Sequence, residues 1–377
     1  MDGGGGYRNV MHLSYRDYRS VPEEELRGEG NDEIEEIYLK ENLIRHFPDW
    51  FFVEMGHLRF LCLAGNVIDT LPPQIGRLVC LETLDLSDNS LQCLPPSLGQ
   101  LGRLSRLLLN GNLLTQLPPE LGRLQRLEVL ELRKNRLTGV PLELGQCGAL
   151  QDLILDDNPG LVSIPTCLFN LPRLCYVSAE RCNLFQLPFA INTTTLQFLR
   201  LFGGNHSLTH CPLALERHAQ PDYDALADRV RRIRNPPCYR KVQCLPVPYM
   251  LNFPAELLTL KDHRSEGLHP PETLLETALR ACAGYGFWAE ELAKINLPKT
   301  LSDRLLYGPV ACCSSVPCGK TLFTEAVLVL VKRKEYARNF LLSALFCSKL
   351  CADRWLQYSC DTYEELAWRL PPVYSRD

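Results

Sequence analysis

One short leucine pattern recurs along the first half of the chain. Five copies start at a constant spacing of 23 residues, at Leu58, Leu81, Leu104, Leu127 and Leu150. A divergent copy starts at Ile34, and two more start at Leu174 and Leu196, which makes eight in all. A unit of this size cannot bury its leucines alone, so the copies must stack on one another. The repeat therefore predicts a solenoid.

The residue types within each copy predict its local structure. In L-x-x-L-x-L a short strand alternates, so its leucines point into the solenoid and its x residues point to the concave face. Asn89 and Asn112 recur at one slot after the strand, and Cys182 fills that slot in its own copy. An amide there can satisfy backbone groups left free where the chain turns. The L-P pair that follows starts a short helical or extended return on the convex side, because proline fixes the entry.

This pattern, L-x-x-L-x-L-x-x-N/C followed by L-P-x-x-φ-x-x-L, resembles leucine-rich repeats. The resemblance implies an α/β horseshoe with a parallel sheet on its inner side. Aromatic residues and arginines dominate the hot spots of protein interfaces, so we expect the outward strand positions to bind a client protein. The plainer alternative is that some of them are only solvated. These positions are Phe60, Asp85, Arg106, Glu131, Arg133, Asp156, Tyr176, Phe198, Arg200 and Phe202, together with Tyr38.

Composition and the N-terminal segment narrow the class of protein. The chain is 46% hydrophobic and 22% charged with a formal net charge of −4, so no global basic excess indicates nucleic acid. The run Lys332-Arg333-Lys334 is too short to change that expectation. MDGGGGYRNV lacks the features of a signal peptide, and no apolar run reaches membrane-spanning length. We therefore expect neither a nucleic-acid nor a membrane partner.

The cysteines and the absence of catalytic motifs indicate an intracellular, non-enzymatic protein. The 17 cysteines are odd in number and mostly scattered, so we expect reduced thiols and a cytoplasmic location, with the nucleus as an alternative. CGKT is not a phosphate loop, because Pro317 removes an amide that the phosphate would need. No serine-triad, zinc-protease or kinase signature occurs. We expect no catalytic activity and no organic cofactor.

Two short helices are expected after the repeats. HPPETLLETALRACAGYG, from His269, reads as a helix entered through prolines, and INLPKTLSDRLLYGP reads as a helix that starts at Pro298. Each carries an apolar stripe of residues four apart, and the two stripes are Leu274, Ala278 and Cys282, and Leu297, Leu301 and Leu305. By themselves these are two small amphipathic helices with an exposed apolar edge.

Both helices resemble boxes of ubiquitin-ligase adaptors. The first resembles the elongin-binding box through Thr273, Leu274 and Ala278, although Cys282 stands where an aliphatic residue is usual. In that family the leucine enters a pocket on elongin C. The second resembles the cullin-2 box through Leu297, Pro298, Leu301 and Leu305. Over nearly its full length the chain resembles leucine-rich repeat-containing proteins 28 and 58, which implies a substrate receptor for a cullin-2 and elongin B/C ubiquitin ligase.

Two cysteine pairs flank the last apolar stretch. Cys313 and Cys318 form C-x4-C, and Cys347 and Cys351 form C-x3-C. Four thiolates suit a closed, tetrahedral, structural zinc site, which would staple a hairpin formed by TLFTEAVLVLVKRKEYARNF. The alternative is a set of buried or idle thiols, and Cys312 could replace Cys313 as a ligand.

The sequence thus predicts an α/β leucine-rich-repeat solenoid, a small helical box and a zinc-stapled β-hairpin domain. The expected domains are an N-terminal cap over residues 1–33, repeats over 34–215, a capping helix and linker over 216–268, the box over 269–308 and the cysteine-paired domain over 309–377. The expected function is capture of a client protein for a cullin-2 ligase. The alternative is a repeat scaffold or signalling regulator with no ligase link.

Overall fold

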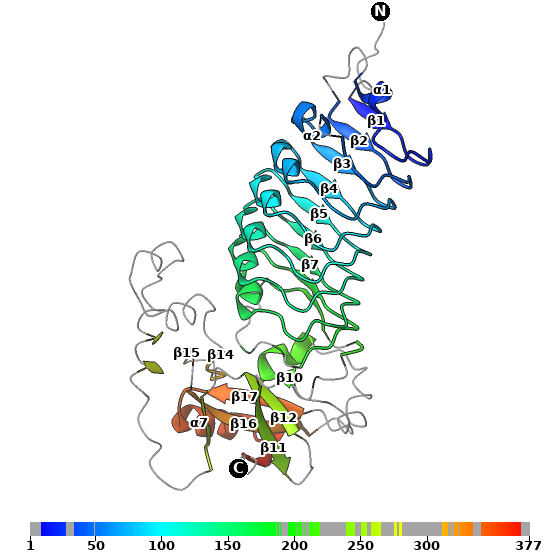
Figure 1. Ribbon diagram of the computed structural model, residues 1–377. Coiled ribbons are helices and arrows are strands. Elements are labelled where there is room, and N and C mark those ends of the chain that lie inside the picture. The colour runs from blue at the N-terminus through cyan, green and yellow to red at the C-terminus, as the bar shows by residue number, and fades with distance from the viewer. Residues whose placement is uncertain are drawn as a thin grey trace, which may run out of the picture. The chain divides into compact units, whose positions relative to one another are not determined.

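The repeats form one parallel sheet in the computed structural model (Figure 1). The residues that the structure describes are 9–27, 34–48, 50–185, 187, 189, 195–201, 203–205, 208, 211–218, 239–245, 250–254, 258–264, 275–276, 279–280, 311–315, 318, 320–323, 325–334 and 341–370. The chain divides into a repeat unit, Met1–Leu161 with Leu171–Cys182 and Thr194–Leu201, and a C-terminal unit of Val162–Asn170, Asn183–Thr193 and Phe202–Asp377.

Nine three-residue strands pair in parallel and in chain order. They are β1 Val10–His12, β2 Glu36–Tyr38, β3 Phe60–Cys62, β4 Thr83–Asp85, β5 Arg106–Leu108, β6 Val129–Glu131, β7 Asp152–Ile154, β8 Tyr176–Ser178 and β9 Phe198–Arg200. The register sets Leu61, Leu84 and Leu107 side by side, and all three are fully buried. This column of leucines is the core of the solenoid, so the predicted fold is confirmed for the repeats.

The sheet has one strand more than the eight copies of the pattern. β1 lies inside residues 1–33, the stretch expected to cap the repeats, and it pairs with β2 through Met11 and Ile37. Its sequence, VMH, lacks the leucine spacing, so the pattern did not reveal it. Pairing with β1 covers the backbone edge that β2 would otherwise expose.

The asparagine at the recurrent slot forms hydrogen bonds that join each repeat to the one before it. The Asn112 amide donates to the carbonyls of Leu86 at 2.9 Å and Leu109 at 3.2 Å, and its oxygen accepts from the Leu91 amide at 3.0 Å. Asn42, Asn66, Asn89, Asn135 and Asn158 donate in the same pattern. Cys182 keeps one such contact, from its Sγ to the Leu155 carbonyl at 3.3 Å. The prediction that this slot satisfies free backbone groups is confirmed.

The convex side is built from short 3₁₀ helices (Figure 1). They are η2 Pro73–Arg77, η3 Pro96–Gln100, η4 Pro119–Arg123 and η5 Leu142–Gln146, and each follows a proline in extended conformation. A Cβ on Gly99 would lie 2.3 Å from the Glu120 carbonyl oxygen of the next coil. Glycine at this slot therefore allows the coils to stack closely. The first two coils use short α-helices instead, α1 Glu23–Leu26 and α2 Phe51–Glu54.

The C-terminal unit contains a mixed sheet of seven strands. Its order is β10-β17-β16-β18-β11-β12, and β13 pairs with the first half of β16, parallel to it. The bounds are β10 Cys211–Pro212, β11 Tyr239–Leu245, β12 Met250–Pro254, β13 Thr259–Asp262, β16 Glu325–Arg333, β17 Leu341–Phe346 and β18 Tyr363–Arg369. The helices with described bounds are η6 Thr166–Asn170, η7 Leu213–His218 and α7 Lys349–Ser359. In the described part of the chain, no helix has the length and apolar character needed to cross a membrane.

The predicted small hairpin is the centre of this sheet and not an isolated element. β16 pairs antiparallel with β17, so the second arm starts at Leu341, after the stretch expected to form the hairpin. Leu328, Leu330 and Leu345 are fully buried in one cluster with Trp368 of β18. A strand with such a continuous apolar run is covered on both faces and needs partners beyond its own hairpin. Those partners come from segments far away in the sequence.

Candidate functional site

Outward positions of β1–β9 form the first candidate site, the concave face of the solenoid. Phe198 is 60% exposed and Tyr176 is half-buried beside it, with ring centroids 6.3 Å apart. Arg106, Arg133 and Arg200 are exposed. Among the other predicted positions, Phe60, Asp85 and Glu131 are half-buried, and Phe202 lies outside the described residues. The face therefore presents aromatic and basic side chains to solvent.

Aromatic rings line the start of this face. His12, Tyr38 and Phe60 come from consecutive strands, with ring centroids 4.8 Å apart for the first pair and 4.7 Å for the second. The Tyr38 hydroxyl donates to Glu36 at 3.0 Å, and burial is the first cause that raises the Tyr38 pKa. The sequence pattern gave no reason to single out His12, because β1 lies outside the repeats.

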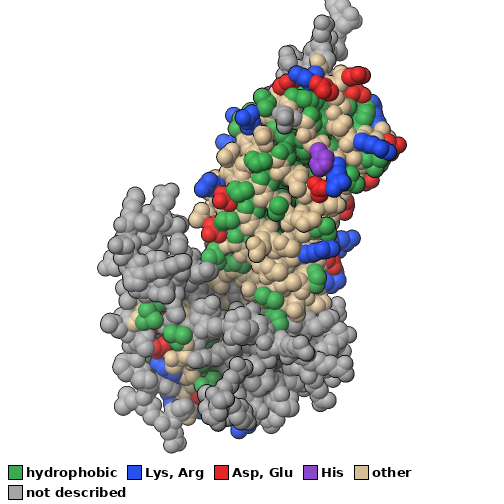
Figure 2. All heavy atoms as spheres, viewed as in Figure 1, with side chains coloured by type: hydrophobic (Ala, Val, Ile, Leu, Met, Phe, Trp, Pro, Cys, Tyr) green, Lys and Arg blue, Asp and Glu red, His purple; other side chains and the backbone are tan. Residues whose placement is uncertain are grey.

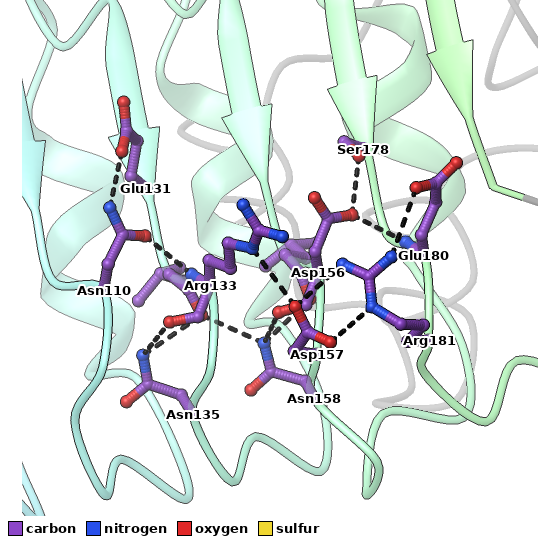
Figure 3. Close-up of polar contacts among 12 residues, drawn as sticks. Asn110, Glu131, Arg133, Asn135, Asp156, Asp157, Asn158, Ser178, Glu180 and Arg181 are labelled. Atoms are coloured by element: carbon purple, nitrogen blue, oxygen red, sulfur yellow. Dashed lines mark hydrogen bonds and ion pairs between the residues drawn. The ribbon is translucent and has the colours of Figure 1, made fainter. Parts of the chain in front are cut away.

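A charged network occupies the other end of the concave side, where the strands turn (Figure 3). The Arg133 Nε lies 3.1 Å from the Asp157 Oδ2, and an Arg181 guanidinium nitrogen donates to the same carboxylate at 2.8 Å. The hydrogen bond from Arg181 is the main cause that lowers the Asp157 pKa to about 2. Arg200 lies 3.3 Å from Glu180, which extends the network to β9. These charges are paired across four neighbouring coils.

Asp156 does not extend into solvent as its slot suggested. Its side chain is buried, and Oδ1 accepts from the Ser178 hydroxyl at 2.6 Å and from the Glu180 amide at 2.7 Å (Figure 3). A carboxylate engaged in this way ties β7 to the coil that follows β8. Its proposed contact with a client stays a prediction.

Three apolar residues at the centre of the concave face were not among the predicted contacts. Leu108, Val129 and Ile154 occupy outward positions of β5, β6 and β7, and each is only half-buried. In the space-filling view, apolar side chains run along the repeats among charged ones (Figure 2). They occupy the same x slots as Asp85 and Arg106, so the repeat pattern could have identified them, but their aliphatic side chains carry neither charge nor an aromatic ring.

The second candidate site is a group of four cysteines in the C-terminal unit. The sulfur atoms of Cys313, Cys318, Cys347 and Cys351 all lie within 4.8 Å of one another. The Cys347 sulfur lies 3.5 Å from that of Cys318 and 3.6 Å from that of Cys351. Four sulfurs at about 2.3 Å from a tetrahedral zinc ion stand roughly 3.8 Å apart. The four thiols can therefore hold a metal ion, and Cys313 is the member of this group while Cys312 is exposed.

Local structure brings these cysteines together. A two-stranded sheet, β14 Ala311–Cys312 and β15 Thr321–Leu322, flanks the loop with Cys313 and Cys318. Cys347 follows β17, and Ser348 caps α7 by accepting from the Cys351 amide at 3.3 Å. A hydrogen bond between Ser314 and Leu345, 2.8 Å from amide to carbonyl, joins the loop to β17.

The pKa values of the Cys313 and Cys347 thiols are shifted in opposite directions. Contact with Cys347 is the main cause that lowers the Cys313 pKa, and the same contact is the main cause that raises the Cys347 pKa. The Cys347 amide also lies 3.4 Å from the Cys313 sulfur and favours its thiolate. Thiolates are the form that binds metals, so this contact favours the metal-binding form at Cys313 and disfavours it at Cys347.

The predicted elongin box is described at four residues. Glu276 and Leu279 are buried, and Leu275 and Arg280 are half-buried. The residues expected to touch elongin and cullin-2 lie outside the described residues; they are Thr273, Leu274, Ala278, Cys282, Leu297, Pro298, Leu301 and Leu305. Their roles stay predictions.

Comparison with known proteins supports the assignment of the leucine-rich repeats. Residues 50–134 match a family described as leucine-rich repeat region, so this part of the chain consists of leucine-rich repeats. A leucine-rich-repeat protein of Leptospira interrogans is 28% identical, with a TM-score of 0.44, over 52% of this chain and 54% of that one. The match thus spans about half the length of the relative.

Chains of two solved complexes are also similar to this chain. A plant peptide hormone receptor, solved in complex with its peptide RGF2, is 25% identical over 49% of this chain and 28% of its own, with a TM-score of 0.36. The Toll–Spätzle complex of Drosophila contributes a chain that is 22% identical over 46% of this chain and 25% of its own, with a TM-score of 0.41.

Proposed function

We propose that this chain is the substrate receptor of a cullin-2 and elongin B/C ubiquitin ligase. The repeat unit captures a client protein on its concave face, and the box helices dock on elongin and cullin-2. The observation that supports client capture is the exposed face of the nine-stranded sheet, where Phe198, Tyr176 and the central apolar residues meet solvent. Exposed aromatic side chains with a polar surround are typical of protein interfaces.

Helical geometry supports the docking half of the proposal. Glu276 and Leu279 are buried in the C-terminal unit, so they mark the inner face of the first box helix. In an ideal α-helix of 3.6 residues per turn, the predicted stripe of Leu274, Ala278 and Cys282 would stand about 130° around the axis from those two residues. The stripe that resembles the elongin box would therefore face away from the chain's own core.

The mechanism would be proximity. A receptor that holds a client beside a ubiquitin-charged enzyme raises the effective concentration of the client's lysines around that enzyme. The receptor supplies no catalytic group under this proposal. Its place of action would be the cytoplasm or the nucleus.

Capture of purified elongin B/C and cullin-2 by the full chain tests the docking half. Leu274→Asp should abolish elongin capture, and Leu350→Asp, at a 65% exposed position of α7, is the matched control. Binding that survives Leu274→Asp would contradict the assigned stripe. If the unmodified chain captures neither protein, the repeat scaffold without a ligase link is the better account.

We also propose that the four cysteines bind one structural zinc ion. The supporting observation is the approach of four sulfurs from two segments to distances near those of a tetrahedral site. Native mass spectrometry of the full chain should show one zinc per chain. A metal-free protein whose four thiols all react with alkylating reagent would refute the proposal.

A further inference from the structure

A fully buried carboxylate fixes the first box helix to the C-terminal unit. The Glu276 side chain is 0% exposed, and its Oε1 accepts from the Phe323 amide at 3.0 Å. Burial of a carboxylate is costly unless a cation and hydrogen bonds compensate it. Arg280, one turn later, supplies the cation, with its guanidinium 2.9 Å from the same oxygen.

Arg280 makes a further contact, with the backbone of β15. Its Nε donates to the Thr321 carbonyl at 2.7 Å, and its side chain is only 12% exposed. Leu279 lies between the two charged residues and is 1% exposed. One helical turn thus binds the backbone at Thr321 of β15 and at Phe323, just after the strand, through two charged and largely buried side chains.

The strand that Glu276 and Arg280 hold belongs to the cysteine loop. β15 begins three residues after Cys318, and Thr321 pairs with Cys312 in β14. The Cys313 amide donates to the Lys320 carbonyl at 2.8 Å. The two strands contribute only two residues each, and a ribbon of that size is not stable by itself.

We propose that metal binding at the four cysteines controls the position of the first box helix through Glu276 and Arg280. The metal holds Cys313 and Cys318 together, which keeps β14 and β15 in register, and β15 then holds the helix. Loss of the metal frees β15, so Glu276 and Arg280 lose their backbone partners and the helix detaches. This inference rests on the proposed function, because the helix is the one that resembles the elongin box.

Hydrogen exchange of the full chain, with and without chelation of its metal, tests the coupling. Amides in residues 275–280 should exchange about tenfold faster or more after chelation, because local opening then costs less free energy. Amides of β5 in the repeat unit should not change. Equal exchange of residues 275–280 in the two states would overturn the inference.

Two variants separate the coupling from simple misfolding. Glu276→Gln keeps an oxygen for the Phe323 amide but removes the charge that pairs with Arg280, so residues 275–280 should exchange faster while the bound zinc stays at one per chain. Glu364→Gln, at a 52% exposed carboxylate of the same unit, is the control and should leave both unchanged. If Glu276→Gln leaves the hydrogen exchange of residues 275–280 unchanged, the Glu276–Arg280 ion pair does not hold the helix.

Elongin capture is measured separately, so the two proposals can fail independently. If the unmodified chain captures elongin B/C only when it is metal-loaded, both stand. Metal-dependent hydrogen exchange of residues 275–280 without elongin capture supports the coupling between metal and helix and refutes docking on the ligase. Elongin capture that is equal with and without the metal supports docking on the ligase and refutes control of the helix by the metal.

Discussion

The two units of this protein are stabilised in opposite ways. In the repeat unit each coil contacts its neighbours through the same few interactions, so the Asn112 amide and the Asn135 amide do the same work 23 residues apart. In the C-terminal unit β16 pairs with β17, the next strand along the chain, and also with β13 and β18, which lie tens of residues away on either side. The first unit repeats one set of contacts in every coil, while the second brings its long-range strand pairing together on β16 and four sulfur atoms together in one cluster.

The comparison predicts that the largest single effect lies in the cysteine cluster. Cys347→Ser removes the sulfur that lies within 3.6 Å of two others, so zinc should be lost together with several kcal/mol of stability in the C-terminal unit. Zinc stoichiometry and thermal unfolding measure both effects. Cys360→Ser, at an exposed thiol, is the control. Full zinc content in Cys347→Ser would show that the cluster is not a metal site.

In the repeat unit, loss of one asparagine amide should be the most damaging change. Asn112→Ala leaves the buried Leu91 amide without its acceptor and removes one of two amide donors from each of the Leu86 and Leu109 carbonyls, which costs about 2 kcal/mol in the free energy of unfolding. Asn112→Cys should cost less, since Cys182 occupies the same slot and keeps one contact. Urea denaturation measures the two changes, and equal losses would show that the amide's extra bonds contribute nothing.

A smaller loss is expected from the close stacking of the 3₁₀ turns. Gly99→Ala places a methyl group 2.3 Å from the Glu120 carbonyl oxygen, so the coils must separate at a cost of about 2 kcal/mol. A Cβ on Gly102 meets no atom within 4 Å, so Gly102→Ala is the matched control. Gly99→Ala should therefore have a lower melting temperature than Gly102→Ala. Equal melting temperatures would mean that the coils can move apart at Gly99 without a loss of stability.

The smallest effect is expected in the charged network. The pKa of Asp157 falls from 3.8 to about 2 on folding, so its ion pairs stabilise the protein above pH 4 and are lost as the pH falls from 4 toward 2. Both arginines are nearly half exposed, which limits the contribution to roughly 1 kcal/mol.

Asp157→Asn should therefore lower stability at pH 7 and change it little at pH 2. Asp88→Asn is the control, because Asp88 has the same left-handed backbone at the equivalent slot. Denaturation curves at the two pH values decide the matter, and a loss of equal size at both would assign the effect to packing.

Much of the concave face was predictable because it follows from the repeat. The leucine spacing fixed which residues are buried, and therefore also placed Phe198, Arg106 and Arg200 outside. The same rule failed for Asp156, whose carboxylate turns back to Ser178 and to the Glu180 amide. A periodic pattern predicts which side of a strand a residue occupies, but not whether a neighbouring coil offers it a hydrogen bond.

For the C-terminal unit, the sequence predicted the ligand type and the pairing of the cysteines but not their surroundings. The hairpin looked isolated because its other partners, β13 and β18, carry no spacing that ties them to β16. Likewise, nothing in the sequence around Glu276 indicated that its carboxylate is buried and accepts a hydrogen bond from Phe323, which lies 47 residues later.

The sequence by itself determined the stack of repeats, the asparagine slot, the proline entry to each convex turn and the two cysteine pairs, because each depends on contacts between residues at short or regular separation. Only the tertiary structure decided that β1 joins the sheet, that four sulfurs meet, and that one buried ion pair joins a helix to the cysteine loop. Those contacts link residues at large and irregular separations, where many pairings are sterically open and only burial of the complete unit selects one.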